Sequence, residues 1–146
     1  MKVRGWIAAC AMVAAPALWA QDTPPTDVDL HAAYCLSVAK RMVAEEQSMI
    51  AANQNNPAAM QMLQPALKGW SSRLDRLQAY VQPRTLVVEP TGMLLAMKRG
   101  QVDIDAAFKA ADECAAQNGT TSQACIAHND VIARTRACGN LDFLPF

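Results

Sequence analysis

Apolar residues recur at helical spacing along most of the chain. Between residues 27 and 53, five apolar residues and His31 follow steps of three, four and seven, which place them on one helical face: Val28, His31, Cys35, Val38, Met42 and Met49. Thr26 or Asp27 is a suitable N-cap for this helix. The pattern predicts a first long helix that ends near Asn53, followed by a turn through Asn56.

The strongest periodic signal follows this turn. Apolar residues alternate at steps of three and four for three heptads: Met60, Leu63, Leu67, Trp70, Leu74, Leu77 and Val81. Asn56 suits the cap position and Pro57 the first helical position. Pro65 lies inside the pattern, so we expect either a kink there or a helix that begins at Gln64.

The second half of the chain predicts two further long helices and one short one. Residues 82–91 read as an extended crossover, and residues 92–100 as a short helix that Gly100 ends. Asp103 or Asp105 opens the next helix, which ends at 118–119, and the last helix runs from a capping box at Thr120 to about Ala137. Abundant Ala, Met, Leu and Gln suit helices. We therefore predict an all-α, disulfide-stapled up-down bundle of four main helices plus one short helix.

The first twenty residues have the layout of a secretory signal peptide. Lys2 and Arg4 precede a mostly apolar run, which is too short and too interrupted by Pro16 for a membrane span. Cleavage after Ala20 is favoured, with Ala17 as the alternative, and residues 21–146 form a single helical domain. This layout predicts a periplasmic or secreted protein without stable membrane insertion after cleavage.

The full chain has 13 basic and 13 acidic residues. Loss of the first twenty residues removes Lys2 and Arg4 but no acidic residue, so the remaining chain is slightly acidic. No basic stripe remains that would favour nucleic acid.

Four cysteines remain in residues 21–146, and an even count in an exported chain predicts two disulfides. In an up-down bundle Cys114 and Cys125 lie at one end, and Cys35 and Cys138 meet at the other. The topology therefore pairs Cys35 with Cys138 and Cys114 with Cys125.

Metal binding is the alternative use of the same residues. His31 with Cys35, and Cys125 with His128, have spacings suited to paired zinc ligands, but the predicted bundle holds the two pairs at opposite ends. Thioether and imidazole groups also suit copper. The candidates for a soft-metal site are Met42, Met49, Met60, Met62, Met93, Met97 and the two histidines. Because Met42, Met49 and Met60 fall on helical seams, core packing is the favoured interpretation, and no metal or other cofactor is expected.

No catalytic constellation is evident in the sequence. It has neither a Gly-x-Ser-x-Gly turn nor a glycine-rich phosphate loop. The acidic pairs Glu45–Glu46, Asp103–Asp105 and Asp112–Glu113 are interpreted as solvated surface pairs. We therefore expect a non-enzymatic binding or interaction module with a protein partner in the cell envelope, and a periplasmic copper-binding protein is the alternative. The apolar tail, residues 141–146, either docks on that partner or packs over the open end of the bundle.

Overall fold

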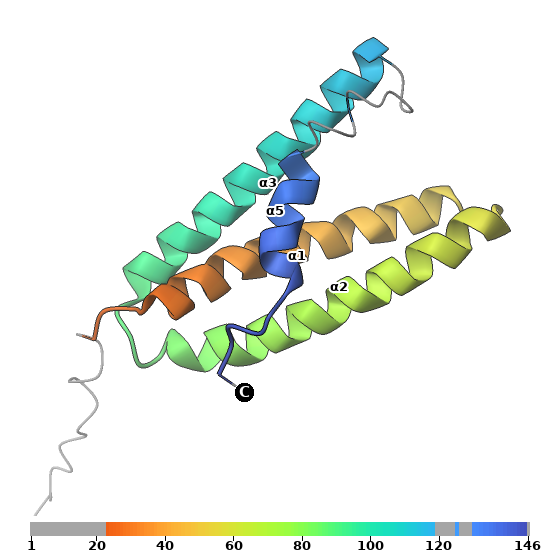
Figure 1. Ribbon diagram of the computed structural model, residues 1–146. Helices are drawn as coiled ribbons and strands as arrows, with labels where there is room; N and C mark the ends of the chain where they lie inside the picture. The colour runs from red at the N-terminus through yellow and green to blue at the C-terminus, as the bar shows by residue number, and fades with distance from the viewer. Residues whose placement is uncertain (1–22, 119–124, 126–129, 146) are drawn as a thin grey trace, which may run out of the picture.

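A computed structural model describes residues 23–118, 125 and 130–145 of the chain. Within these ranges four helices run up, down, up and down: α1 (Asp27–Ala52), α2 (Pro57–Arg84), α3 (Pro90–Asn118) and the short α5 (Asp130–Gly139) (Figure 1). The described residues contain no strand. The predicted all-α, disulfide-stapled bundle is confirmed. The signal peptide at 1–20, the capping box at Thr120 and His128 lie outside the described residues.

Helix α1 is the centre of the bundle. It packs against α2, α3 and α5. Between Ala32 and Ala39 only Tyr34 remains partly exposed, so α1 buries every face there instead of the single predicted face. Alanine, cysteine and serine provide most of this stretch, and their small side chains let three helices approach one.

The starts of α1 and α2 follow the predicted capping chemistry. Thr26 is the N-cap of α1, and its side chain and that of Asp29 form a reciprocal capping box. Asn56 caps α2, where its side chain accepts a hydrogen bond from the Ala59 amide at 3.2 Å. Helix α2 runs without interruption through Pro65, so the alternative start at Gln64 is wrong.

The predicted crossover at residues 82–91 is largely wrong. Helix α2 continues to Arg84, and the link to α3 is a turn in which the amides of Val87 and Val88 both donate to the Arg84 carbonyl at 3.0 Å. Val88 is buried in the core. Burial of this valine and the two amide bonds explain why the segment folds back tightly instead of extending.

Gly100 does not end a helix, which corrects the prediction of a separate short helix at 92–100. It lies inside the continuous α3, where a Cβ atom would collide with the backbone carbonyl of Tyr34 on α1. The glycine therefore allows close contact between the two helices. That packing offsets the roughly 1 kcal/mol by which glycine disfavours a helix interior.

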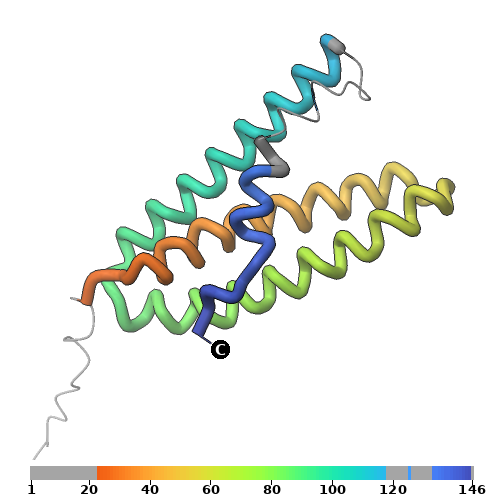
Figure 2. The backbone as a smooth tube through the Cα atoms, viewed as in Figure 1, coloured from red at the N-terminus to blue at the C-terminus, as the bar shows by residue number. Residues whose placement is uncertain are grey.

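The hydrophobic core occupies one end of the molecule, which we call the proximal half. Here α1 and α3 begin, α2 ends and the C-terminal tail packs (Figure 2). The opposite ends form the distal half, where α3 diverges from the α1–α2 hairpin (Figure 2). Among the residues whose side chains the structure describes, none in the ranges 47–76, 108–117 and 133–137 is buried. The two halves therefore differ sharply in packing.

Two disulfides join the helices. Cys35 bonds to Cys138 with a Cα–Cα distance of 5.2 Å, and Cys114 bonds to Cys125 at 5.7 Å. These are the same partners that the sequence pairs. The first bond ties α1 to α5 within the core, and the second closes a short loop at the distal end of α3. Within the described part of the chain, no helix has the length and hydropathy needed to cross a membrane.

Candidate ligand-binding cleft

A cleft of about 690 Å³ opens where α1, α3 and α5 meet in the proximal half. Its volume lies within the roughly 300–1,000 Å³ range of small-molecule sites. Its walls combine aliphatic side chains with a charged cluster: Leu30, His31 and Tyr34 from α1, Gly92, Leu95, Ala96, Arg99 and Asp103 from α3, and Arg134 and Ala137 from α5. Three helices thus build one concave surface.

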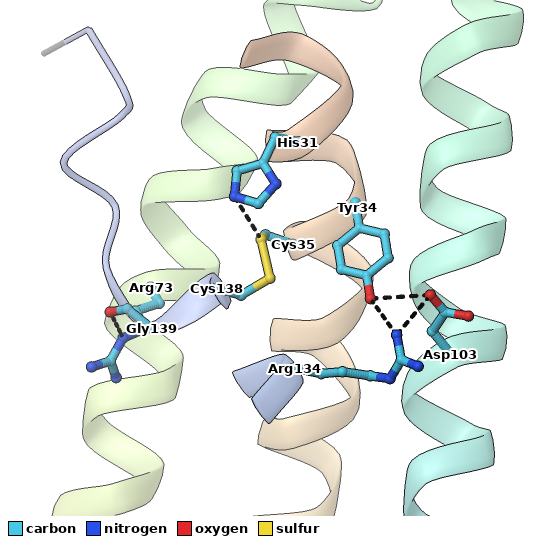
Figure 3. Close-up of a disulfide and its surroundings, with 8 residues drawn as sticks. All are labelled: His31, Tyr34, Cys35, Arg73, Asp103, Arg134, Cys138 and Gly139. Carbon is cyan, nitrogen blue, oxygen red and sulfur yellow. Dashed lines mark hydrogen bonds and ion pairs between the residues drawn. A yellow bond between two sulfur atoms is a disulfide. The ribbon is translucent and has the colours of Figure 1, made fainter. Parts of the chain in front are cut away.

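A polar cluster forms the charged side of this cleft. Tyr34 points from α1 toward α3, and Arg134 reaches the same place from α5 (Figure 3). The Tyr34 hydroxyl donates to Asp103 Oδ2 at 3.2 Å, and Arg134 Nη1 donates to the same oxygen at 3.0 Å. Arg134 Nη1 also lies 3.4 Å from the Tyr34 oxygen. The cluster fixes the relative positions of three helices around the cleft.

Arg99 adds a second guanidinium to the charged side. Its Nε atom is 3.9 Å from Asp103 Oδ2, and its side chain is 81% exposed. Such an exposed and distant ion pair contributes little stability. The Arg99 charge therefore remains accessible from the cleft.

The disulfide holds one wall of the cleft. Cys138 follows Ala137 directly, and its bond to Cys35 fixes this part of α5 against α1 (Figure 3). On α2, Arg73 Nε donates to the Gly139 carbonyl at 2.8 Å, which anchors the end of α5 a second time. The geometry of the wall is therefore set by a covalent bond and a hydrogen bond.

His31 lies beside this disulfide and under the C-terminal tail. Its Nε2 atom is 3.8 Å from Cys35 Sγ, and its ring meets the Phe143 ring edge-on at a centroid distance of 4.6 Å. Leu141 and Leu144 are buried in the core. The tail thus packs on the helices, which is one of the two roles that the sequence leaves open.

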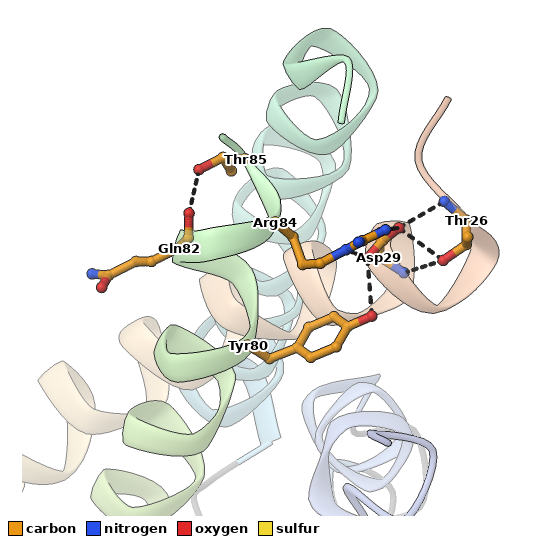
Figure 4. Close-up of polar contacts among 6 residues, drawn as sticks. All are labelled: Thr26, Asp29, Tyr80, Gln82, Arg84 and Thr85. Carbon is orange, nitrogen blue, oxygen red and sulfur yellow. Dashed lines mark hydrogen bonds and ion pairs between the residues drawn. The ribbon is translucent and has the colours of Figure 1, made fainter. Parts of the chain in front are cut away.

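A second polar network, around Asp29, closes the proximal end next to the cleft. The buried carboxylate accepts bonds from Arg84 Nε and Nη2, both at 2.8 Å, and from the Tyr80 hydroxyl at 2.9 Å (Figure 4). The Thr26 amide and hydroxyl also donate to it at 2.8 Å. The bonds from Arg84 above all lower the pKa of Asp29, against the opposing effect of burial. Asp29 is thus a charged residue that ties α1 to α2.

Two of the acidic pairs predicted to be solvated each contain one residue that is not, Glu46 and Asp103. Glu46 is buried, and burial followed by the nearby Glu45 charge raises the pKa of its carboxyl group. Its Oε2 atom has no hydrogen-bond partner among the described residues. Asp103 belongs to the cleft cluster in the middle of α3, while Asp105 binds Arg41 at 3.1 Å. The prediction is wrong for Glu46 because it lies four residues after Met42, on the inner face of α1.

The residues considered for metal binding are dispersed. Met93 is fully buried in the core, Met42 and Met97 pack against it, and Met62 is 74% exposed on α2. Cys35 and Cys125 are both in disulfides, so neither offers a thiolate. Within the described ranges, no group of three or more His, Cys, Asp or Glu side chains is placed to hold a metal ion.

Sequence reasoning missed Tyr34, Arg99 and Arg134 as members of a site. The predicted helix end at Gly100 places Arg99 at a helix terminus, whereas in the structure it lies inside α3 and faces the cleft. For Asp29 a signal existed, since it lies three residues after Thr26 in a capping-box arrangement. The partners that tie these carboxylates to other helices, Arg84 for Asp29 and Arg134 for Asp103, are 55 and 31 residues away, so local spacing does not predict them.

Comparisons of the chain with protein-family models, with curated proteins and with solved structures found no match.

Proposed function

We propose that this protein is a small exported binding module that takes up a ligand in the cleft between α1, α3 and α5. Export is supported by the signal-like layout of residues 1–20 and by two disulfides that fit an oxidising compartment. The N-terminus of the protein recovered from the periplasm tests this part. We expect it to begin at Gln21, whereas an intact Met1 would contradict export through a cleaved signal.

The observation that carries the binding proposal is the position of the cleft on a covalently fixed scaffold. The Cys35–Cys138 bond holds α5 in place beside Ala137, and the Tyr34–Asp103–Arg134 cluster holds the facing wall. A preorganised site loses less conformational entropy when a ligand binds. The fold thus presents a concave surface whose shape is fixed before a ligand binds.

The proposal is one of binding without catalysis. Tyr34 and Asp103, two lining residues of a type that can act as a nucleophile, are hydrogen-bonded to each other, and Asp103 is also bound to Arg134. His31 packs edge-on against Phe143 and lies beside the disulfide. The polar groups of the cleft are therefore assigned to recognition.

The cleft rather than the tail is proposed as the contact site. Leu141 and Leu144, which would have to leave the core to dock elsewhere, are 3% and 4% exposed. A larger partner in the cell envelope would therefore bind while these two leucines stay buried in the core.

An uncharged fluorescent probe tests the binding proposal. N-phenyl-1-naphthylamine should bind the oxidised protein saturably and with one site, and Ala137→Trp should weaken binding at least tenfold by filling the cleft. Ala137 is exposed, so the variant should fold. Ala106→Trp is the matched control, because Ala106 is an exposed residue of α3 that does not line the cleft. Equal effects of the two variants, or no saturable binding, would overturn the proposal.

A further inference from the structure

The cleft changes character along its length. Gly92, Leu95 and Ala96 line it near the start of α3, and Arg99 and Asp103 line it further along the same helix. Helix α5 runs in the opposite direction, so Ala137 faces the apolar end and Arg134 the charged end. From residue 92 to residue 103 an α-helix rises about 17 Å. The site therefore has an apolar end and a charged end separated by roughly that length.

The charged end carries a net positive charge. Arg99 and Arg134 contribute two guanidinium groups, and Asp103 is the single carboxylate among the lining residues. Arg134 is bound to Asp103 at 3.0 Å, whereas Arg99 makes only the 3.9 Å contact with it. The planar guanidinium fork matches the two oxygens of a carboxylate. An anionic group entering this end therefore meets Arg99 with its donors still accessible.

The apolar end is lined mostly by aliphatic residues: Leu30, Gly92, Leu95, Ala96 and Ala137. His31, the polar lining residue next to Leu30, packs edge-on against Phe143 and lies beside the disulfide. Leu95 is 62% exposed. A peptide placed here would leave most of its amide groups without protein partners, which costs free energy. An aliphatic chain has no such groups and removes the leucine surface from water. This end thus favours a hydrocarbon chain.

We infer that the cleft binds a single-chain amphiphilic carboxylate, with its head group at Arg99 and its aliphatic chain along Leu95, Ala96 and Leu30. This inference rests on the proposed function, because it names the ligand class for the same site. This ligand class is selected by two features of the cleft: an accessible guanidinium at one end, and an apolar lining that runs from it toward the other end.

Displacement of N-phenyl-1-naphthylamine from the oxidised full chain tests the inference. The competitors are dodecanoate, dodecanol and dodecyltrimethylammonium, each used below its micelle-forming or solubility limit. We expect dodecanoate to displace the probe at least ten times more effectively than dodecanol, with dodecyltrimethylammonium the weakest. Equal displacement by all three would overturn the carboxylate assignment while leaving the binding proposal intact, because the probe itself still binds.

Charge-removing variants locate the head group. Arg99→Gln should weaken dodecanoate binding about tenfold and leave dodecanol unchanged. Lys98→Gln is the matched control, since it removes the same charge from an exposed neighbour that does not line the cleft. An equal loss for both variants would reduce the effect to general charge attraction and overturn the assignment. A tenfold preference for dodecyl phosphate over dodecanoate would also overturn it.

Discussion

The proximal and distal halves of the bundle contain the same kinds of stabilising feature but differ in how well these features are packed. Each half has one disulfide and one buried carboxylate of α1. In the proximal half Cys35–Cys138 lies in the core, and Asp29 has five hydrogen bonds from Thr26, Tyr80 and Arg84. In the distal half Cys114–Cys125 is outside the core, and Glu46 has an oxygen without a partner among the described residues. Stability is therefore concentrated where the cleft lies.

The contrast also shows how a cleft can be kept open. A concave site with an exposed leucine needs walls that do not collapse onto each other. In the proximal half the disulfide, the Asp29 network and the Gly100 contact fix α5, α2 and α3 around α1. The distal half lacks this packing among the residues that the structure describes.

The largest expected effect is the loss of the core disulfide. The Cys35→Ser/Cys138→Ser variant opens a loop of 103 residues, which in the chain-entropy model costs about 4–5 kcal/mol of stability. Urea unfolding of the oxidised variant measures this. We also expect weaker binding of N-phenyl-1-naphthylamine, because α5 is no longer tied beside the cleft. Unchanged stability would contradict the role given to this bond.

The next largest effect should follow removal of Arg84. Arg84→Ala leaves the buried Asp29 carboxylate without its two strongest bonds, which we expect to cost about 2–3 kcal/mol. The value is below that of a fully buried pair because the Arg84 side chain is 34% exposed and water can partly replace it. Arg76→Ala on the exposed face of α2 is the control and should change stability by less than about 0.5 kcal/mol.

The distal disulfide should matter less. Its loop spans 11 residues, for which the same model gives at most about 3 kcal/mol. Because no described residue of this half of α3 is buried, we expect Cys114→Ser/Cys125→Ser to loosen this end locally and to leave probe binding in the cleft unchanged. Hydrogen exchange would show faster exchange confined to the end of α3. An equal loss of stability for both double variants would break the comparison.

The smallest effect is a gain at Glu46. Its pKa is raised in the folded state, so the unfolded chain releases this proton at lower pH and the residue destabilises the fold as pH rises above the ordinary carboxyl range. Glu46→Gln should therefore stabilise the protein at pH 7 by about 1 kcal/mol, with a smaller gain at pH 4. Asp29→Asn should instead destabilise the protein, by nearly the same amount at pH 7 and pH 4 and by less at pH 2, because stability from a lowered pKa is lost only as pH falls below the ordinary carboxyl value. Denaturant curves at pH 7, 4 and 2 distinguish the two residues.

Local signals account for what the sequence predicts well. The α1 and α2 helices and their caps at Thr26 and Asn56 depend on neighbours within four residues, and the cysteine partners follow from helix order alone. The prediction is wrong for Gly100 because glycine suits both a helix stop and a close-packing position, and only the α1 backbone decides between them. The prediction is wrong for Glu46 for a different reason: its spacing of four from Met42 places it on the inner face of α1, and this outweighs its acidic neighbour. The cleft brings together residues as far apart in the sequence as Leu30 and Ala137, which are 107 positions apart. Periodicity within single helices does not predict such a contact.

Mass spectrometry of the native protein under non-reducing conditions tests the central claim most directly, because the scaffold around the cleft depends on its disulfides. The account predicts two linked peptide pairs, Cys35 with Cys138 and Cys114 with Cys125, and no free thiol among these four cysteines. Free thiols, or a bond from Cys35 to Cys114 or Cys125, would contradict it.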